Sequence, residues 1–498
     1  MTALTASPEL ATRRGRRILA LLCAVAFLDF VDASITNVAL PHIRVALHFS
    51  AQDLQWVPAA YLLTYGGFML LGGRLADVIG RRTMILAGTG LVAVSSLIGG
   101  FAGNSGVFVG ARLAQGLGAA LMLPAALSTL TTTFREGKDR HTALGAWAAV
   151  AGLASAVGIL LGGVLTEGPG WRWVMFVNPI ACAAIIPAVL AVLPHDRPAA
   201  AGARFDLVGA LLATGGMLAL VFALVKAPDQ GWGAATTWWE FAGAAVLLAA
   251  FLLNERLVRE PLLPLGLFRT RGMLAADVTG FVGFSGLLAM FYFLTLYMQN
   301  VLGYSPVQAG AAYLPLTFAV GISSGIGAKL LTKVGSRPVI VTGALTAAAG
   351  MFLLGHVPVH GTYGPSILPG LLLVAFGMGP VFVGVTSAAN AGVPADRAGI
   401  AAAVLSSFQQ TGGALGLAIM SAVATSQTTH LTVRGLDLAH ASTSGYQHAL
   451  LTGAWLTLGA ALIALRAANT RADPMAAGHG APADENLPDV DLAAAQQQ

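Results

Sequence analysis

Long apolar runs separated by short polar segments are the main pattern of this 498-residue chain. A helix needs about 20 predominantly apolar residues to cross the hydrocarbon core of a bilayer, and fourteen windows have roughly that length. The sequence therefore predicts an all-α polytopic membrane protein with fourteen transmembrane helices, both termini on one side, and a flexible outer segment at 426–445. The windows fall near 18–40, 54–74, 83–102, 106–126, 143–165, 174–193, 207–226, 237–254, 273–298, 308–331, 338–356, 366–388, 398–424 and 446–466.

The composition supports a membrane protein. Charged residues make up only 10% of the chain and hydrophobic residues 56%. Soluble domains carry about 25% charged residues, so this composition excludes a soluble globular protein. The net charge of +5 does not indicate nucleic-acid binding, because the cations are spread over loops without a basic stripe. Cys23 and Cys182 lie in apolar runs, which favours small buried side chains over a disulfide or a metal site. We expect no metal and no cofactor.

The distribution of lysine and arginine orients the predicted helices. Residues 1–17 carry four arginines, and the apolar run after them is too long for a signal peptide and lacks a clear cleavage site. With this end inside, 22 of the 27 Lys and Arg fall on inner segments, four on outer segments, and Arg112 within a span. Positive charge in short loops favours the cytoplasmic side. We therefore expect a multi-pass protein of the cell membrane with both termini in the cytoplasm.

The windows divide into two six-helix halves with two extra central helices between them. Gly335-Ser-Arg337 follows the second helix of the later half with the spacing of Gly80-Arg-Arg82 in the first, although Thr332 replaces Asp77. Two related halves around a midplane site are typical of secondary transporters, which rock the halves to give alternating access. The predicted parts are a basic cytoplasmic N-terminus (1–17), the first half (18–193), two extra helices with linkers (194–272), the second half (273–466) and a disordered cytoplasmic tail (467–498).

A charged turn connects the second and third predicted helices. In Gly73-Arg-Leu-Ala-Asp77-Val-Ile-Gly80-Arg81-Arg82, Gly80 permits a tight reversal, and Asp77 and Arg81 have the spacing at which opposite charges meet on a helix. One interpretation is a loop that only orients the two helices. The pattern, however, closely resembles the loop between helices two and three of the major facilitator superfamily. The resemblance implies that Gly73, Asp77, Gly80, Arg81 and Arg82 form a conformational switch that latches the inner side of an outward-open carrier.

Two aspartates lie within the first predicted span, where burying charge is costly. Asp29 and Asp32 are three residues apart and share a helix face. A carboxyl group at that depth can exchange a proton near physiological pH, as a proton carrier requires; the alternative is structural, with hydroxyls and amides holding the carboxylates. Asp32-Ala-Ser-Ile-Thr-Asn37-Val-Ala-Leu-Pro41 resembles the helix-1 signature of the fourteen-helix drug/proton antiporters of the same superfamily, with Asp32 at the acidic position. Asp29 is then an additional acid one turn nearer the cytoplasm.

The fourth predicted helix contains Arg112-Leu-Ala-Gln115-Gly116-Leu-Gly118. An arginine in the middle of a span needs a counter-ion or a wet cavity. The segment resembles the family's Arg-x-x-Gln-Gly-x-Gly-Ala helix, and the resemblance links Arg112 to proton transfer. If Arg112 lies near Asp32, it stabilises the ionised aspartate, so conformation can gate protonation. A permanent structural ion pair is the alternative, and Gln115 is a candidate for the substrate cavity.

Glycines mark the fifth predicted helix. Gly158, Gly162 and Gly163 give a smooth surface that allows close helix packing. The antiporter motif of the family has Gly-Pro-x-x-Gly-Gly here, whereas this chain has Ile159 in place of the proline, which removes the forced kink. We expect a helix-packing motif at these glycines.

The ninth predicted helix combines an acid with aromatic side chains. Asp277 lies about two turns from its inner start and is a proton-coupling candidate. An acid beside aromatic rings suits a lipophilic cation, although aromatic residues in a span also face lipid or the core. Gln409 and Gln410, in the thirteenth predicted helix, either face the cavity or bridge helices. The substrate-cavity candidates are Gln115, Phe281, Phe284, Tyr292, Gln409 and Gln410.

The resemblance implies a proton-coupled multidrug efflux transporter, a drug/proton antiporter for lipophilic or lipophilic cationic compounds and antibiotics. In the expected cycle a proton from outside neutralises a carboxylate, Asp32 first and then Asp277 or Asp29. No glycine-rich phosphate site indicates a nucleotide-driven pump, so the expected partners are protons, a lipophilic small molecule and the bilayer, without nucleotide, nucleic acid or enzymatic activity. Two alternatives stay open: a dedicated exporter of an endogenous metabolite with the same fold, and a non-transporting membrane sensor or scaffold. Ile159 favours the latter.

Overall fold

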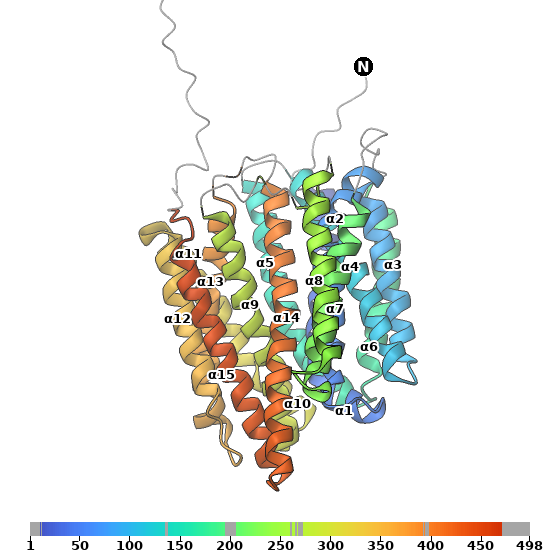
Figure 1. The fold of residues 1–498 in the computed structure, drawn as a ribbon. Coiled ribbons are helices and arrows are strands. Elements are labelled where there is room, and N and C mark those ends of the chain that lie inside the picture. Colours follow the sequence, from blue (N-terminus) through green and yellow to red (C-terminus); the bar gives the residue numbers. More distant parts are fainter. Residues whose placement is uncertain are drawn as a thin grey trace, which may run out of the picture.

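The computed structural model describes residues 10, 12–134, 138–194, 206–258, 261–263, 266, 272–391, 393 and 398–470. Within these residues the chain is helical and forms no β-strand (Figure 1). Outside them lie 1–9 and 11 of the predicted N-terminal segment, 195–205 and most of 259–271 in the central region, and 471–498 of the predicted tail. The α-helices are α1 (Arg13–Ala46), α2 (Trp56–Ile79), α3 (Arg81–Gly100), α4 (Ser105–Thr133), α5 (Lys138–Glu167), α6 (Trp173–Val192), α7 (Leu207–Gln230), α8 (Ala235–Leu257), α9 (Met273–Leu296), α10 (Pro306–Ala312), α11 (Leu314–Val334), α12 (Ser336–Leu354), α13 (Leu368–Ala389), α14 (Ala398–Val433) and α15 (Leu438–Ala464).

The helices of the described chain provide fourteen spans. Thirteen of them are long and apolar enough to cross a bilayer, and one of these is formed by α10 and α11 together, with an interruption at Tyr313. The fourteenth is α14, which has 36 residues but is more polar because it carries side chains such as Gln409 and Gln410. The predicted all-α architecture with fourteen transmembrane helices is confirmed.

The prediction was wrong for the outer segment 426–445, which is helical rather than flexible. α14 continues to Val433, and α15 begins at Leu438 after a short turn in which Gly435 has a φ of +88°. Asp437 caps α15 by accepting a hydrogen bond from the backbone N–H of His440 at 3.3 Å. The two helices pack against each other along the hairpin. Polar composition was misleading here, because a part of a helix that extends beyond the bilayer core has polar side chains but still forms its helical backbone hydrogen bonds.

The two halves share one pattern of helix contacts. In each half the second and third helices pack against the fourth, the first packs against the fifth, and the third packs against the sixth, so the second half repeats the first in space. The equivalent pairs are α2–α4 and α11–α13, α3–α4 and α12–α13, α1–α5 and α9–α14, and α3–α6 and α12–α15.

The Gly-x-Arg pattern that both halves share in sequence has a structural counterpart. Gly80 and Gly335 each join the second helix of a half to the third, with φ values of +112° and +90° that favour glycine. Two residues further on, Arg82 Nη2 donates to the Leu190 carbonyl at 2.9 Å, and Arg337 Nε donates to the Ala467 carbonyl at 3.0 Å. Each arginine therefore ties the start of the third helix to the end of the sixth in its own half.

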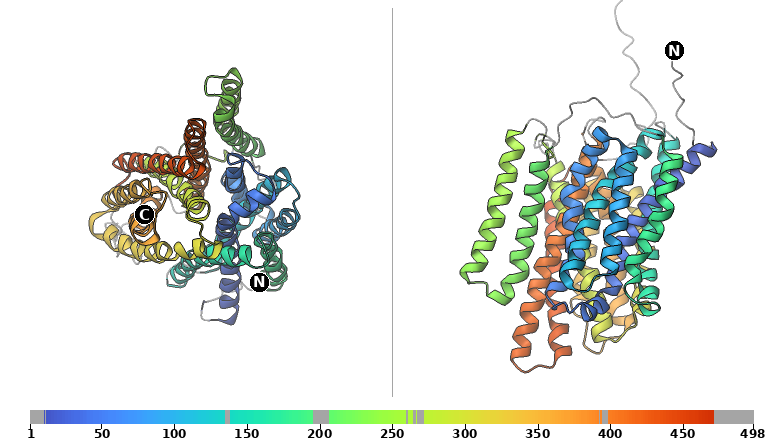
Figure 2. Two further views of the ribbon diagram at one scale, coloured as in Figure 1. Left: turned by 90° about the horizontal axis from the view of Figure 1, so that it is seen from below. Right: turned by 90° about the vertical axis from the view of Figure 1, so that its right-hand side faces the viewer.

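The two extra helices are central in sequence but peripheral in space. α7 packs on α2 and α14, where the two halves meet, and α8 packs mainly on α7 (Figure 2). Lys226 at the end of α7 forms an ion pair with Asp53 at 3.4 Å. At the other end, Asp206 caps α7 through Gly209 N–H and also accepts a hydrogen bond from Asn254 of α8. These contacts hold the two extra helices, α7 and α8, against the outside of the bundle.

Helix α1 begins and helix α15 ends at the same end of the bundle, here called the inner end (Figure 1). The opposite, outer end is closed by contacts between the halves. Gln299 Nε2 donates to the Val38 carbonyl at 2.8 Å, and the Val307 N–H donates to Glu167 Oε2 at 3.3 Å. The largest cluster of buried apolar side chains also contains residues from both halves.

The inner end is organised differently. Its apolar side chains form separate clusters, one confined to the first half, around residues such as Ile18 and Val189, and one confined to the second, around Ala276 and Val385. The described residues therefore show halves that are joined at the outer end and in the middle, and that share no apolar cluster at the inner end. The two halves are therefore packed together more closely at the outer end than at the inner end.

Candidate functional site

The candidate site is a buried polar cluster in the first half, centred on Asp32 of α1. The side chain of Arg112, on α4, donates from Nη1 to Asp32 Oδ2 at 3.0 Å. The other carboxylate oxygen accepts hydrogen bonds from Gln115 Nε2 at 3.3 Å and from the amide of Asn178 on α6. Asp32 is 2% exposed and Arg112 1% exposed. This buried carboxyl group is thus held by hydrogen bonds from three side chains on two other helices, which stabilise the ion pair.

The guanidinium of Arg112 has further partners that fix its position. Its Nη1 also donates to Gln115 Oε1 at 2.8 Å, and its Nε donates to the Val57 carbonyl of α2 at 3.2 Å. Gln115 in turn donates to Ser96 Oγ of α3 at 2.6 Å. Gln115 is fully buried, so the structure places this predicted cavity residue inside the charge cluster. One network thus connects α1, α2, α3, α4 and α6.

Asp29 is held separately, by two phenols of α2. Tyr61 donates its hydroxyl to Asp29 Oδ1 at 3.0 Å, and Tyr65 donates to Oδ2 at 3.4 Å. The Tyr61 ring also lies beneath the guanidinium of Arg112, whose Cζ is 4.4 Å from the ring centroid, within cation–π range. Tyr61 therefore contacts both the Asp29 carboxyl group and the arginine that pairs with Asp32.

Sequence analysis missed four members of this cluster. The sequence did not single out Asn178, Ser96, Tyr61 or Tyr65. Each is a lone polar side chain in an apolar helix, so its own surroundings in the sequence give no signal. A polar residue facing the bundle interior at the depth of Asp32 is the feature that identifies them.

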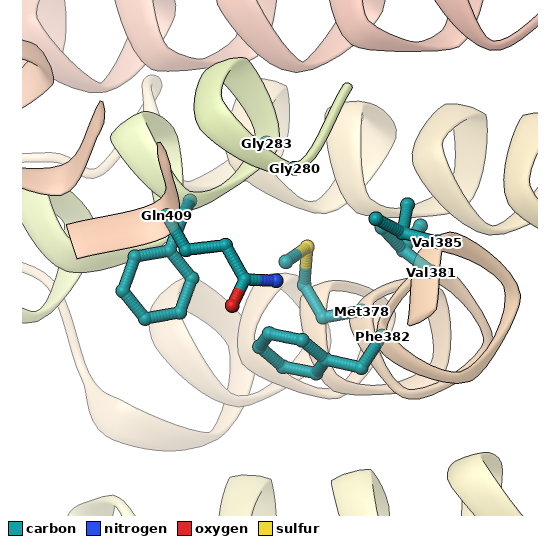
Figure 3. A pocket seen from close by; sticks show the side chains of 8 residues that line it. Gly280, Gly283, Met378, Val381, Phe382, Val385 and Gln409 are labelled. Carbon is teal, nitrogen blue, oxygen red and sulfur yellow. The ribbon is translucent and has the colours of Figure 1, made fainter. Parts of the chain in front are cut away.

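A small, mostly apolar pocket lies in the second half, between α9, α13 and α14 (Figure 3). Two glycines of α9 leave space that is bounded by the rings of Phe284 and Phe382, which meet edge to face at 6.0 Å. Gln409 of α14 is the one amide on its wall. The lining residues are Gly280, Gly283, Phe284, Met378, Val381, Phe382, Val385 and Gln409.

The other predicted cavity residues lie in different places. Phe281 is beside the pocket and packs edge to face on Phe408 at 6.3 Å. Gln410 lies against Gly66 of α2, where the halves meet. Tyr292 is buried among the aromatic side chains of the outer cluster, 5.1 Å from the ring of Phe293, and does not line the pocket. Tyr292 follows Phe281 by eleven residues in α9. It therefore lies on the same face of the helix, but about 16 Å further along the helix axis.

Asp277 is fully buried in α9, and neither of its carboxylate oxygens has a hydrogen-bond partner. An ionised carboxylate without a donor is very costly in an apolar interior, so these surroundings favour the protonated form of Asp277. Asp32, which has a guanidinium and two amides as donors, lies in the opposite kind of environment. The pocket wall does not include Asp277.

The charged turn lies at the inner end. Asp77 and Arg81 form an exposed ion pair at 3.7 Å across the break between α2 and α3, and Arg81 Nη1 donates to Thr132 of α4 at 2.7 Å. Gly73, the first motif glycine, has its nearest neighbour 3.7 Å from the place where a Cβ would lie. The preceding Gly72, which sequence analysis missed, lies directly on the Ala120 carbonyl of α4 and leaves no room for a Cβ.

The three motif glycines of α5, Gly158, Gly162 and Gly163, lie against two different helices. Gly158 and Gly162 contact α1 at Val31 and Ile35, and a Cβ on either would come within about 3 Å or less of that backbone. Gly163 contacts α10, where a Cβ would be 2.7 Å from the Pro306 carbonyl. The contact is reciprocal, because a Cβ on Gly310 of α10 would be 2.9 Å from the Ile159 carbonyl. Here the two halves meet through backbone, which requires small residues.

Two six-helix halves joined at one end, with a buried ion pair inside the first half, are typical of polytopic membrane transport proteins. Residues 22–417 match the family model described as the Major Facilitator Superfamily. The chain belongs to this family, which confirms the resemblance seen in the motifs.

Relatives of the chain are antibiotic resistance and export proteins. The chain is 40% identical to the puromycin resistance protein of Streptomyces alboniger over 82% of each chain. It is 35% identical to the tetracenomycin C resistance and export protein of Streptomyces glaucescens, covering 80% of this chain and 73% of that protein. With the cephamycin export protein of Amycolatopsis lactamdurans it shares 37% identity over 84% of this chain and 86% of the relative. These matches place it in the drug-efflux branch of the superfamily.

Solved structures of transporters share the fold. A peptide transporter in complex with sulfate superposes with a TM-score of 0.66 and covers 92% of this chain and 96% of its own. A bacterial homologue of the lysosomal transporter Spinster, solved in an inward-facing and unoccupied conformation, superposes with a TM-score of 0.63, covering 91% and 97%. The sequence identities are 15% and 16%, so these matches concern the fold alone.

Proposed function

We propose that the chain is a proton-coupled efflux transporter that exports antibiotics or similar lipophilic compounds by alternating access. The observation that carries this proposal is the buried Asp32–Arg112 pair, held by Gln115 and Asn178 in the centre of the first half. A carrier driven by protons needs an ionisable group in the membrane whose charge state changes with conformation. The names of the relatives support antibiotic export.

The proposed substrate region includes the pocket between α9, α13 and α14. Its walls are aromatic and aliphatic with a single amide, Gln409, which suits a lipophilic molecule with one polar group. Substrate enters from the cytoplasm or the inner leaflet, since the halves share no apolar cluster at the inner end of the described chain. Asp277, one turn before Gly280, supplies a negative charge for a cationic substrate once its proton has left.

The proposed location is the plasma membrane, with the inner end in the cytoplasm, because positive charge gathers on segments at that end. When the halves rock, the outer contacts open and the inner end closes. The turn at Asp77 and Arg81 then latches the closed inner end.

A second candidate is an exporter dedicated to one compound. Relatives of this chain carry the name of a single antibiotic each, puromycin, tetracenomycin C, cephamycin or lincomycin, whereas another is called a multidrug resistance protein. The small volume of the pocket and its single amide also suit a narrow range of substrates.

The test is transport in proteoliposomes with an imposed pH gradient, using puromycin and ethidium as probes. We expect both probes to be transported in the direction opposite to proton flow, and we expect an uncoupler to abolish this transport. Transport of puromycin alone favours the dedicated exporter. Movement that is unaffected by the uncoupler contradicts proton coupling, and a well-folded protein that moves neither probe contradicts export of these compounds and favours a sensor or scaffold.

A further inference from the structure

We infer that Asp29, and not Asp32, holds the transported proton in this conformation, and that Tyr61 links this proton site to the Asp32–Arg112 pair. The inference deepens the proposed function and rests on it only for the transport step. It is carried by the positions of two carboxyl groups around a single arginine, by their burial, and by the two phenols of α2.

The first step concerns charge. Asp29 and Asp32 are one helical turn apart, and each is only 2% exposed. Arg112 is the one cation in contact with this pair among the described residues, and its hydrogen bond goes to Asp32. With both carboxyl groups ionised, the buried cluster would carry a net negative charge far from water, which is very costly. One proton makes the cluster neutral.

The second step concerns which carboxyl group takes that proton. Asp32 accepts hydrogen bonds from a guanidinium and two amides, and these donors stabilise the ionised form. Within the described part of the chain, the Asp29 carboxyl group accepts side-chain hydrogen bonds from the hydroxyl groups of Tyr61 and Tyr65 alone. A phenol can donate to a carboxylate or accept from a carboxylic acid. The two hydroxyls can therefore bind Asp29 in both its protonated and its ionised form. The proton therefore resides on Asp29.

The third step concerns communication between the two groups. The hydroxyl of Tyr61 binds Asp29 Oδ1, while the face of its ring supports the guanidinium of Arg112. When the Asp29 proton leaves, the new carboxylate competes with Asp32 for the arginine, and Tyr61 lies between them. Tyr61 is thus a positioning residue for both sites.

Among the residues that the structure describes, the other ionisable groups near this pair do not supply a second cation. Helix α6 contributes the fully buried thiol of Cys182, which interacts electrostatically with Asp32, and α2 contributes Tyr61 and Tyr65. Helix α1 begins at the inner end, so Asp29 is one turn closer to that end than Asp32. In the inward-facing state, the O–H bond of Asp29 breaks, the proton passes to water at the inner end, and the carboxylate remains. The carrier is then ready to bind substrate.

The direct test is infrared spectroscopy of the full-length protein in liposomes during a pH titration, which needs no substrate. The titration is run in the Asp277→Asn background, because the buried Asp277 would contribute a second protonated carboxyl group. There we expect a carbonyl band of a protonated carboxyl group that disappears as pH rises, and adding Asp29→Asn should remove this band. Tyr61→Phe, which keeps the ring under Arg112, should move the band to higher frequency because the carbonyl oxygen loses a donor. A band that survives Asp29→Asn unchanged overturns the inference.

A second measurement separates this inference from the proposed function. Substrate counterflow exchanges labelled and unlabelled puromycin without net proton movement. We expect Asp29→Asn to keep counterflow near the wild-type rate while uptake driven by a pH gradient falls at least tenfold. Gradient-driven uptake that persists in Asp29→Asn refutes the assignment to Asp29. If wild type itself shows no gradient-driven uptake, proton coupling fails, whereas the infrared result still decides where the proton resides.

Discussion

Arg112 of α4 and Asp32 of α1 form a 3.0 Å ion pair across 80 positions of sequence, with both side chains almost completely removed from solvent. Both charged groups have further hydrogen-bond partners. Two amide side chains donate to the Asp32 carboxylate, and a backbone carbonyl of α2 accepts a hydrogen bond from Arg112 Nε. Burial on this scale costs several kcal/mol per ion, which only this set of partners offsets. The pair therefore helps to fix the packing of α1, α2 and α4.

The first prediction concerns this pair. Arg112→Leu leaves Asp32 buried without a cation, and we expect a loss of about 3–5 kcal/mol of stability. The double variant Asp32→Leu/Arg112→Leu removes both charges and should lose clearly less than the sum of the single variants. Thermal unfolding of the four proteins in detergent measures this cycle. Additive losses would show that the two side chains do not interact.

The second prediction separates two adjacent glycines in α2. Gly72→Ala drives a methyl group into the Ala120 carbonyl of α4, whereas Gly73→Ala has its nearest neighbour at 3.7 Å. We expect Gly72→Ala to lower stability by about 1–3 kcal/mol through overpacking, and Gly73→Ala to fold normally. Unfolding temperature and transport rate of both variants provide the check. Equal effects would contradict the packing of α2 on α4 described above.

The fold was predictable because the bilayer imposes one simple rule. A span must be helical and apolar over a fixed length, so apolar windows identify thirteen of the spans directly. Helix ends outside the bilayer obey local rules instead. At Gly435 and Asp437 the chain turns within a few residues, and a polar composition did not distinguish this hairpin from a flexible loop.

The candidate site was predictable only where a residue is unusual by itself. A charge in a span is rare, which singled out Asp29, Asp32, Arg112 and Asp277. Tyr61 gave no such signal, because a tyrosine is common in an apolar helix and its hydroxyl finds Asp29 only after α1 and α2 pack. The order of protonation expected from the sequence, with Asp32 first, stays a prediction, and the charge balance around Arg112 favours Asp29.

The third prediction concerns the turn at the inner end. Asp77→Asn removes the ion pair with Arg81, and we expect the maximal transport rate to fall at least severalfold while the substrate concentration at half-maximal rate changes little. We expect this because the proposed latch acts on the change of conformation and not on substrate binding. Thr332→Ala, at the equivalent position of the second half, is the matched control, because in the described chain its hydroxyl donates to the Lys329 carbonyl of its own helix and to no other residue. An altered preference between puromycin and ethidium in Asp77→Asn would argue against a switching role.

The fourth prediction concerns the pocket in the second half. Phe382→Ala removes one wall of the pocket and the edge-to-face contact with Phe284. We expect weaker binding of a lipophilic substrate, by about 1–2 kcal/mol or roughly 5- to 30-fold, with a smaller effect on folding. Direct binding of ethidium measured by fluorescence anisotropy tests this. Phe352→Ala serves as the control, since Phe352 lies on the outside of α12 and is 52% exposed. Equal effects of the two variants would exclude the pocket as a substrate site.

The fifth prediction concerns the contact between the halves at the outer end. Gly163 of α5 and Gly310 of α10 each lie so close to the facing backbone that a methyl group on either would be within 3 Å of a carbonyl oxygen. Gly163→Ala should therefore keep α5 and α10 apart and shift the carrier towards an outward-open state. Gly152→Ala is the control in the same helix, because among the described residues no atom beyond its own stretch of helix lies within 4 Å of the place where its Cβ would be.

The readout is labelling of Val38→Cys, at the outer closure, by a membrane-impermeant thiol reagent after Cys23 and Cys182 have been replaced by alanine. Val38 is fully buried, and its carbonyl accepts the hydrogen bond from Gln299 that joins the halves. We expect slow labelling in the parent and in Gly152→Ala, and labelling several times faster in Gly163→Ala. Because the contact is made by backbone on both sides, Gly310→Ala should reproduce the effect. Unchanged labelling in both variants would mean that the α5–α10 contact does not hold the outer end closed.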